Sequence, residues 1–534
     1  MNTVIVGTGP LSFADVVEVA RAGAVVALAA EAEAEISASR KVIETLADDI
    51  APHYGVSTGF GALATRHIPP GLRAQLQRSL VRSHAAGSGQ EVEAEVIRAM
   101  MLLRLSTLAT GRTGVRLSTA QTYVRMLNAG ITPVVREYGS LGCSGDLAPL
   151  AHCALAAMGE GEVRVQTWAR PGQRTGALLP AREALPAREA LAAAGIEPVV
   201  LAEKEGLALI NGTDGMLGML VLAAADLRAL LKTADITAAM SVEALLGTDA
   251  AFAADLQALR PHPGQAASAA NLRALLDSSP VVASHKGPDD TRVQDAYSLR
   301  CSPQVHGAAR DTLEHAETVA GRELASAIDN PVVTLDGRVV SNGNFHGAPV
   351  GYVLDFLAIA AADLASIAER RTDRMLDAHR SHGLPPFLAD DPGVDSGHMI
   401  AQYTSAGIVS ELKRLAAPAS VDSIPSSAMQ EDHVSMGWSA ARKLRRCVDG
   451  LTRVLAIELL TAARALDLRA PLSPSAATGA VVDGLRAGDE PGARARVAGP
   501  GTDRYLAPEI EAAVSYVATG AAVRAAETAV GPLQ

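Results

Sequence analysis

The sequence is poor in aromatic residues, and it carries no excess of positive charge. Phe, Trp and Tyr make up only 3% of its 534 residues, whereas apolar residues recur at helical rather than alternating spacing. This combination favours extended helices that pack through small residues such as alanine. The net charge of -11 argues against a nucleic-acid surface, since binding phosphates needs clustered Lys and Arg. Small molecules are therefore the expected ligands.

Cysteines are also few, and the sequence predicts neither a disulfide framework nor a metal site. The four cysteines are scattered without a CxxC pair. No HExxH motif occurs, and the consecutive residues 431–433 cannot share one helix face as metal ligands. The first positive charge is Arg21, so the N-terminus does not resemble a signal peptide. The longest uninterrupted apolar run, 215–225, is shorter than the roughly 20 residues of a membrane-spanning helix. We therefore expect a cytoplasmic protein with no membrane partner.

The chain is expected to be mainly α-helical and to divide near residue 200. Residues 1–200 combine short helices with glycine-rich loops, which predicts a mixed N-terminal domain. Residues 201–534 show longer helical patterns, which predict a helical bundle domain with a C-terminal helical region. Helices are predicted at 13–22, 91–110, 212–246, 305–327, 350–376, 398–416, 433–469 and 508–528. An alanine-rich bundle of this kind commonly buries further surface in an oligomer, so we expect subunit association.

Three local patterns are assigned no chemistry. Gly7-Thr8-Gly9 could begin a dinucleotide-binding loop, but Ser12 occupies the third glycine position and no βαβ unit is predicted after it. Residues 179–184 are repeated at once as 185–190, which favours a surface insertion. The glycine- and proline-rich segment 486–502 predicts a mobile connection.

The tripeptide Cys143-Ser144-Gly145 carries the strongest chemical signal, because it can become an electrophile. Glycine lacks a Cβ, so the amide nitrogen of Gly145 can approach the carbonyl carbon of Cys143 and close a five-membered ring. Loss of water from the ring and of the Ser144 hydroxyl would leave an exocyclic methylene conjugated to an imidazolone, a group that amines attack. Ser-Gly pairs are also common in turns, and two others occur at 88–89 and 396–397, so the signal needs support from other residues.

Six further segments carry residues suited to a polar reaction site: 54–61, 82–87, 204–213, 293–304, 343–346 and 430–433. The first places Tyr54 beside three glycines, which allows a tight loop to carry a phenol. Arg300 can grip a carboxylate in bidentate fashion. The candidates are Tyr54, His84, Asn211, Gln294, Tyr297, Arg300, Phe345 and Glu431. Each has a structural alternative when taken alone, as Asn211 could equally cap a helix.

Taken together, these segments resemble the aromatic amino acid ammonia-lyase family, and most closely its histidine-specific members. The resemblance extends from the Tyr54 loop to the helix predicted at 433–469. It implies an all-helical fold of the fumarase/aspartase-like superfamily and a homotetramer in which each active site is built from three subunits. It also implies that residues 143–145 form a 4-methylideneimidazole-5-one (MIO) group, so that no external cofactor is needed.

Three positions depart from the commonest family pattern. Cys143 stands where Ala is usual, whereas Ser57 and Met429 stand where Asn is frequent. The actinobacterial type of this lyase is similar in these features. Cys143 contributes only its carbonyl to the ring, so its side chain is expected to be a spectator. The resemblance does not fix how Ser57 and Met429 affect hydrogen bonding near the site.

The resemblance assigns roles in the elimination of ammonia across Cα and Cβ, which here would convert L-histidine to trans-urocanate. The amine adds to the methylene derived from Ser144, which splits one hard step into easier ones. Tyr54 is the candidate base, although a phenol ionises near pH ~10, so its pKa must be lowered or its proton passed on. The implied binding roles are Arg300 for the carboxylate, Tyr297, Asn211 and Gln294 for the amine and the electrophile, Phe345 for packing, and His84 and Glu431 for the imidazole.

His84 and Glu431 decide the expected substrate. Phenylalanine-specific relatives present an apolar residue and an amide at these two positions, and the tyrosine-specific type has Leu where Ala85 follows His84. A buried carboxylate without a partner costs roughly 1–3 kcal/mol, so Glu431 disfavours a benzene ring. The alternatives within the family are a phenylalanine or tyrosine ammonia-lyase and a 2,3-aminomutase. The alternatives outside the chemistry of this family are a noncatalytic helical oligomer and a cofactor-free lyase of the fumarase type.

Overall fold

Two compact units make up the chain. The computed structural model describes residues 2–49, 53–59, 61–166, 183–288, 290, 293–488 and 496–534. The first unit comprises residues 1–222, 317–355 and 418–442, and the second comprises 223–316, 356–417 and 443–534. Each unit is thus assembled from stretches that are distant in the sequence. The linear division into domains 1–200 and 201–534 stays a prediction. Residues 179–182 of the repeat and 489–495 of the glycine-rich segment lie outside the described residues.

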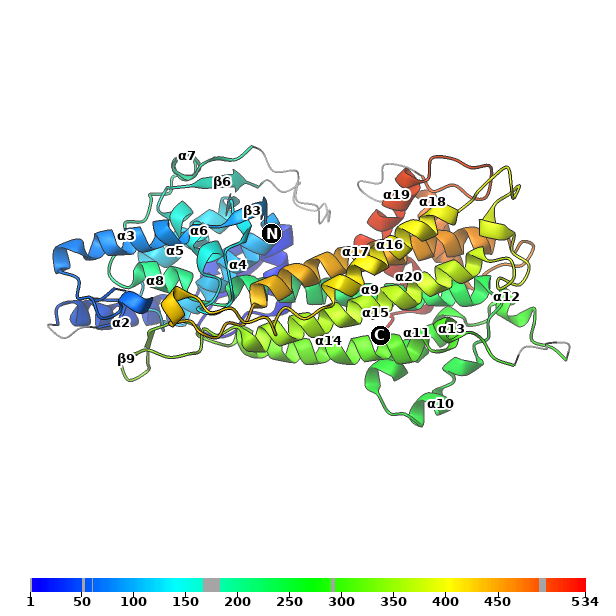
Figure 1. Cartoon of the computed structure of the whole chain (residues 1–534), viewed down its shortest axis with the longest axis horizontal. Coiled ribbons are helices and arrows are strands. Elements are labelled where there is room, and N and C mark those ends of the chain that lie inside the picture. The colour runs from blue at the N-terminus through cyan, green and yellow to red at the C-terminus, as the bar shows by residue number, and fades with distance from the viewer. Residues whose placement is uncertain are drawn as a thin grey trace. The chain divides into compact units, whose positions relative to one another are not determined.

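Helices dominate both units, which confirms the mainly α fold class (Figure 1). Those within the first unit are α1 (Phe13–Val17), α2 (Ala30–Ala47), α3 (Arg73–His84), α4 (Ala94–Ala109), α5 (Leu117–Asn128), α6 (Leu147–Ala157), α7 (Ala187–Ala193) and α8 (Glu205–Ile210). Those within the second are α10 (Ala254–Ala258), α11 (Pro263–Leu275), α12 (Pro280–Ala283), α13 (Tyr297–Arg300), α16 (Met399–Leu415), α18 (Ala476–Ala487), α19 (Ala507–Ala518) and α20 (Ala521–Val530). Four unit boundaries fall within α9 (Asp214–Ala244), α14 (Ser302–Leu324), α15 (Ala348–Leu376) and α17 (Gly437–Asp467), and a fifth follows residue 417, between α16 and α17.

Short strands form four small sheets in the first unit. In one sheet β1 (Thr3–Val6) pairs with β2 (Val25–Leu28) in parallel, whereas the strands of the other sheets pair antiparallel. The others are β3 (Ser88–Glu91) with β5 (Arg136–Tyr138), β4 (Ile131–Pro133) with β6 (Glu162–Val165) and β7 (Leu185–Pro186), and β8 (Val332–Val333) with β9 (Val339–Val340). The second half of the predicted repeat therefore enters a strand and α7.

The N-terminal segment corrects one expectation. No βαβ unit was expected after Gly7, yet β1 and β2 pair in parallel, with α1 and a π-helical turn, Glu18–Ala22, between them. The rejection of a dinucleotide loop is unaffected, because within the described part of the chain this sheet has only two strands. Ser12 instead caps α1: its hydroxyl oxygen accepts a hydrogen bond from the Asp15 amide, and the Asp15 carboxylate accepts one from the Ser12 amide.

The C-terminal region corrects another expectation. One helix was predicted at 508–528, but the structure has two, α19 and α20. Gly520, between them, has a φ of +73°, a left-handed conformation that interrupts a right-handed helix. The pattern missed the break because apolar residues continue at helical spacing on both sides of the glycine.

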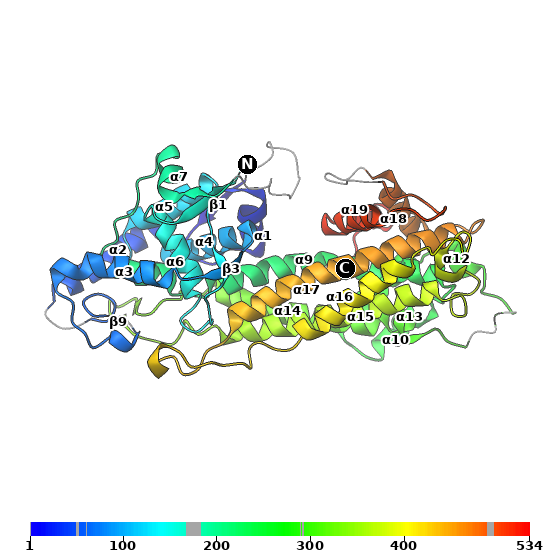
Figure 2. The same cartoon turned by 45° about the horizontal axis from the view of Figure 1, so that its top comes forward.

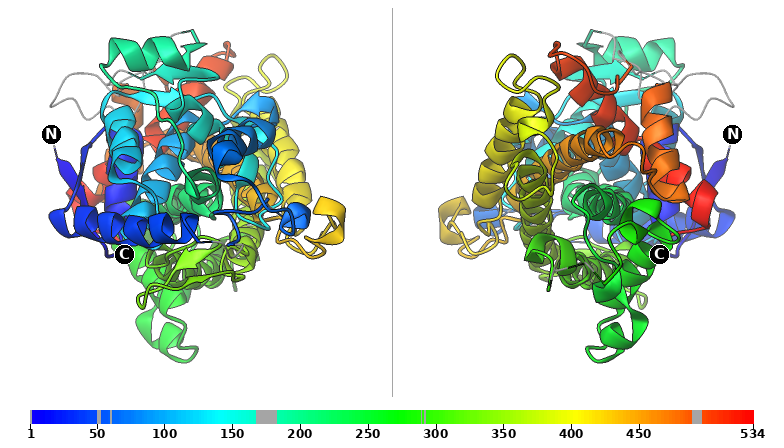
Figure 3. Two further views of the ribbon diagram at one scale, coloured as in Figure 1. Left: turned by 90° about the vertical axis from the view of Figure 1, so that its left-hand side faces the viewer. Right: turned by 90° about the vertical axis from the view of Figure 1, so that its right-hand side faces the viewer.

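Long helices build the core of the second unit. Figures 1 and 2 show α15, α16 and α17 running alongside one another, and Figure 3 views such helices nearly end-on. On α17, apolar residues at helical spacing form a stripe that is fully buried: Leu444, Cys447, Leu451, Val454, Leu455 and Ile457. Two segments, 205–244 and 348–376, are long and apolar enough to cross a membrane by length and composition. The most apolar window of the first is entirely buried in the protein, as in a core helix of a globular fold.

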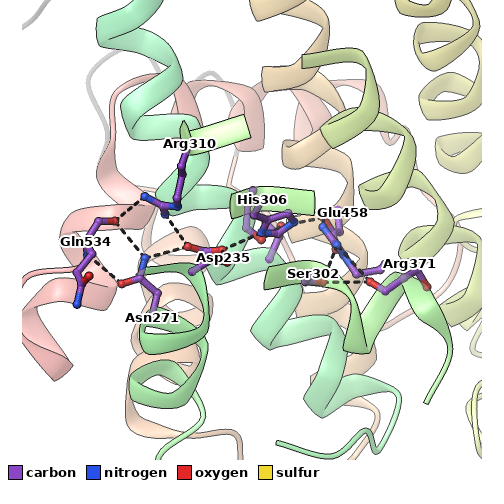
Figure 4. Close-up of polar contacts among 12 residues, drawn as sticks. Asp235, Asn271, Ser302, His306, Arg310, Arg371, Glu458 and Gln534 are labelled. Carbon is purple, nitrogen blue, oxygen red and sulfur yellow. Dashed lines mark hydrogen bonds and ion pairs between the residues drawn. The ribbon is translucent and has the colours of Figure 1, made fainter. Parts of the chain in front are cut away.

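Buried ion pairs join the helices of the second unit (Figure 4). Arg371 of α15 and Glu458 of α17 are both fully buried and lie 2.5 Å apart, and Glu458 also accepts hydrogen bonds from Thr237 and Ser241 of α9. A second pair joins Asp235 of α9 to Arg310 of α14 at 2.6 Å, and the His306 ring of α14 forms a hydrogen bond of 2.8 Å with the same carboxylate. These carboxylates have several donors each, which offsets the cost of removing their charges from water.

Candidate active site

The loop between β5 and α6 carries residues 143–145, and distant segments hold it. The Trp438 indole donates a hydrogen bond to the Glu137 carbonyl (2.7 Å), and the Met436 amide donates one to the Leu141 carbonyl (2.8 Å). The Gly142 carbonyl accepts from the Ser435 hydroxyl at 2.6 Å. Because α17 begins at Gly437, the start of this helix fixes the loop from one side.

Asp146 fixes the other side of the tripeptide. Its carboxylate accepts hydrogen bonds from the Ser140 hydroxyl and from the amides of Gly215 and Met216, each at 2.9 Å. The last two belong to the first turn of α9, where a carboxylate is favoured by the helix dipole. Burial raises the pKa of this carboxyl to about 7, against the opposing effect of these donors. Sequence analysis gave Asp146 no role, although it follows the tripeptide directly.

Gly145 has a conformation and surroundings that admit only glycine. It has a φ of +82°, and a Cβ built on it would lie 2.1 Å from the Gly212 carbonyl oxygen. A side chain is therefore excluded both by the left-handed conformation and by space. The fold therefore also requires glycine at this position, independently of ring closure.

Replacing Gly145 by alanine should strongly reduce the fraction of chains that form the MIO group, because a Cβ must displace the Gly212 backbone. The near-ultraviolet absorbance of the MIO group, measured per subunit, checks this. Gly71→Ala is the matched control, since no atom lies within 4 Å of its added Cβ and its φ is not left-handed. Full absorbance in Gly145→Ala would contradict the requirement.

Glu431 lies at the centre of the site. One carboxylate oxygen accepts from the Ser144 hydroxyl at 3.2 Å, and the other accepts from the Cys143 thiol at 3.2 Å and the Ser426 hydroxyl at 3.0 Å. Backbone hydrogen bonds between Ser426 and Glu431 close the turn that presents it. Burial, with the charge of Glu431, raises the pKa of the Cys143 thiol to about 12. A protonated thiol is a poor nucleophile, which agrees with a spectator role.

Tyr54 and His84 share the electrostatic environment of Glu431. Burial, and then the charges of Glu431 and Asp329, raise the pKa of the Tyr54 phenol, whose oxygen accepts from the Gly61 amide at 3.2 Å. Burial lowers the pKa of His84, while the Leu80 carbonyl and Glu431 oppose that shift. A phenolate base requires a lowered Tyr54 pKa. Burial, Glu431 and Asp329, all within the first unit, instead raise this pKa.

Asn211 and Phe345 also belong to the first unit. Asn211 ends α8 and does not cap the next helix: its side-chain nitrogen donates to the Asn330 carbonyl at 2.8 Å. Its side-chain oxygen is buried and has no hydrogen-bond partner among the described residues. Phe345 is half-buried in the loop before α15, and the following His346 stacks on His433 with ring centroids 5.7 Å apart. This stacking brings the loop beside the segment that carries Glu431.

The remaining three candidates belong to the second unit. Gln294 precedes α13, and Tyr297 and Arg300 are its first and last residues. The Arg300 guanidinium lies 4.7 Å from the centre of the Tyr297 ring, and its Nε donates to the Asp295 carbonyl at 2.9 Å. Tyr297 is 71% exposed. The structure thus groups Tyr54, His84, residues 143–145, Asn211 and Glu431 in one unit and these three in the other.

Ser57 and Met429 differ in their surroundings. Ser57 is fully buried, and its hydroxyl accepts from the His53 amide at 2.9 Å, so it closes the turn that contains Tyr54 and Gly55. Met429 is 67% exposed and has a φ of +68°, a conformation that Asn adopts more readily. No cluster of three or more His, Cys, Asp or Glu side chains suited to a metal occurs among the described residues.

Known proteins resemble this chain over its whole length. A sequence model described as aromatic amino acid lyase matches residues 11–487. Histidine ammonia-lyase of Streptomyces avermitilis is 64% identical over 533 residues, which cover 100% of both chains. The structure of tyrosine aminomutase from Streptomyces globisporus has a TM-score of 0.89 at 37% identity, covering 100% of both chains. Histidine ammonia-lyase from Trypanosoma cruzi has a TM-score of 0.86 at 38% identity, covering 99% of this chain and 96% of the other. These likenesses agree with the expected fumarase/aspartase-like fold.

Proposed function

The chain belongs to the aromatic amino acid lyase family, and on that basis we propose that it is a carbon-nitrogen lyase that converts L-histidine to trans-urocanate and ammonia. Full-length identity of 64% to a histidine ammonia-lyase supports this substrate over phenylalanine or tyrosine. The reaction would be the first step of histidine degradation.

The placement of Glu431 carries the choice of substrate. In the chain as encoded, one oxygen of this carboxylate accepts from the Ser144 hydroxyl. Formation of the MIO group removes that hydroxyl, so the oxygen needs a new donor. An imidazole N–H can supply one, whereas a benzene ring cannot. His84, whose pKa is lowered by burial, lies in the electrostatic range of the same carboxylate and would complete the polar pocket.

Residues 143–145 fit the proposed MIO group. Gly145 is the residue type that ring closure needs, and Asp146 and Ser435 hold the loop on both sides. When formed, the group supplies an electrophilic carbon for the substrate amine. The buried Asn211 oxygen without a partner is suited to accept a hydrogen bond from that amine. Tyr54 remains our candidate for taking the β-proton.

A homotetramer with sites shared among three subunits would bring Arg300, Tyr297 and Gln294 to the reaction centre. Arg300 would then hold the substrate carboxylate, and its positive charge would lower the pKa of a nearby phenol. Exposed apolar side chains on α15 and α16 support such an assembly: Phe356, Ile359, Ile400 and Tyr403 are 46–62% exposed. The four cysteines all lie among the described residues and are free thiols, which fits a reducing cytoplasm.

Incubating the purified protein with single amino acids tests the proposal. We expect urocanate and ammonia from L-histidine, with far lower turnover of phenylalanine and tyrosine. Cinnamate or coumarate as the main product would identify a different lyase, and a β-amino acid would identify an aminomutase. Absence of ammonia release from all three would contradict a lyase.

A further inference from the structure

Two consecutive residues hold the two ends of helix α8. Asp329 binds the Lys204 ammonium at 2.5 Å, and Lys204 is the residue directly before α8. The Asn330 carbonyl accepts a hydrogen bond from the side chain of Asn211, the residue directly after α8. A helix of six residues spans roughly 9 Å, so this arrangement fixes its position and its direction. The side chain of Asn211 is thereby oriented from both ends.

The Lys204–Asp329 pair is unusually deep for an ion pair. Both side chains are fully buried, and Lys204 has a left-handed φ of +70°. Burial lowers the pKa of Lys204 and raises that of Asp329, while each charge opposes the shift of the other. Removing one partner of such a pair leaves an uncompensated buried charge. A left-handed lysine at this depth is retained only where its surroundings over-determine it, which points to function.

The Tyr54 loop lies beside Lys204 of this pair. A Cβ built on Gly55 would lie 3.4 Å from Pro331 Cδ and 3.6 Å from Lys204 Cδ, so the loop backbone at Gly55 is close to the Lys204 side chain. The charges that act on the Tyr54 phenol are those of Glu431 and Asp329. Glu431 also acts on His84, while Lys204 and Arg104 act on Asp329. The positive charge of Lys204 is therefore placed to offset the negative charge of Asp329 near the Tyr54 loop.

We infer that Lys204 and Asp329 are positioning residues of the elimination: their buried ion pair orients Asn211 through α8, supports the Tyr54 loop, and sets the charge beneath it. Neither side chain needs to touch the substrate. The inference rests on the proposed function, and nothing in the sequence pattern alone assigned either residue a role.

The variants Lys204→Met and Asp329→Asn test this, with kcat for histidine measured against pH. We expect kcat to fall about tenfold or more in each, with a smaller change in KM, because a displacement near 1 Å is costly in a reaction site. Activity rises with pH as the base loses its proton. Asp329→Asn removes a negative charge that raises the Tyr54 pKa, so its ascending limb should lie at lower pH than that of Lys204→Met.

Arg116→Met is the matched control. Arg116 forms a 2.5 Å ion pair with Glu205, which follows Lys204 in α8, but it is not part of the Asp329 contact. This variant should lower thermal stability without moving the pH profile of kcat.

The inference would be overturned if the ascending limbs of the pH profiles of Lys204→Met and Asp329→Asn coincided. If a single variant does not fold, the double variant decides: full MIO absorbance with kcat about tenfold lower is expected, and wild-type kcat would overturn it. Failure of the wild-type protein to form urocanate would instead count against the proposed function.

Discussion

Ser144→Ala is expected to abolish both the MIO absorbance and histidine turnover. The hydroxyl of Ser144 is the group that must leave to create the methylene, and alanine has none. Turnover should fall by at least about 10³-fold, because removing a residue essential to covalent catalysis can cost up to about 10⁶-fold in kcat. The fold should survive, because the Ser144 hydroxyl donates its hydrogen bond only to the half-buried Glu431 among the described residues.

Cys143→Ala is the control for this prediction. Its carbonyl would still enter the ring, and its thiol, with a pKa raised to about 12, has no role as a nucleophile. This variant should keep the absorbance and most of the activity. Intact-mass measurement adds an independent reading: the active protein should be lighter than the encoded chain by two waters, and Ser144→Ala should not. A fully active Ser144→Ala enzyme is incompatible with the proposed mechanism.

The local chemistry of the site was accessible from the sequence. Residues 143–145 indicated ring closure, because the reaction itself requires glycine at the third position. Gly145 has a left-handed backbone conformation. Helix positions followed from apolar spacing, as for the buried stripe of α17. Tyr54, His84 and Glu431 were chosen as separate motifs, and the fold places them in one electrostatic neighbourhood.

The supporting contacts were not accessible, because they join residues far apart in the chain. Lys204 and Asp329 are 125 positions apart, and neither residue type at its position signals an ion pair. The parallel pairing of β1 and β2 was missed for a related reason, since four-residue strands give little periodic signal. The raised pKa of Tyr54 likewise depends on burial, and then on two carboxylates, which only the fold brings about.

Two roles for Glu431 can be separated by one substitution. Its contact with the Ser144 hydroxyl would permit a part in ring formation, whereas the need for a new donor after ring formation assigns it to the substrate imidazole. These roles differ in when they act. The first predicts that a variant lacks the MIO group, and the second predicts that it keeps the group but loses histidine turnover.

We expect the second outcome for Glu431→Gln. Truncating one partner of a hydrogen-bonded charge pair costs about 2–4 kcal/mol, which corresponds to roughly 30- to 10³-fold in kcat/KM for histidine. The MIO absorbance should remain, since Asp146 and Ser435 still hold the loop. Ser426→Ala, which removes a donor to the other carboxylate oxygen, should have a much smaller effect. Near-normal histidine turnover in Glu431→Gln would remove the physical basis for the substrate assignment, and loss of the absorbance would move Glu431 into ring formation.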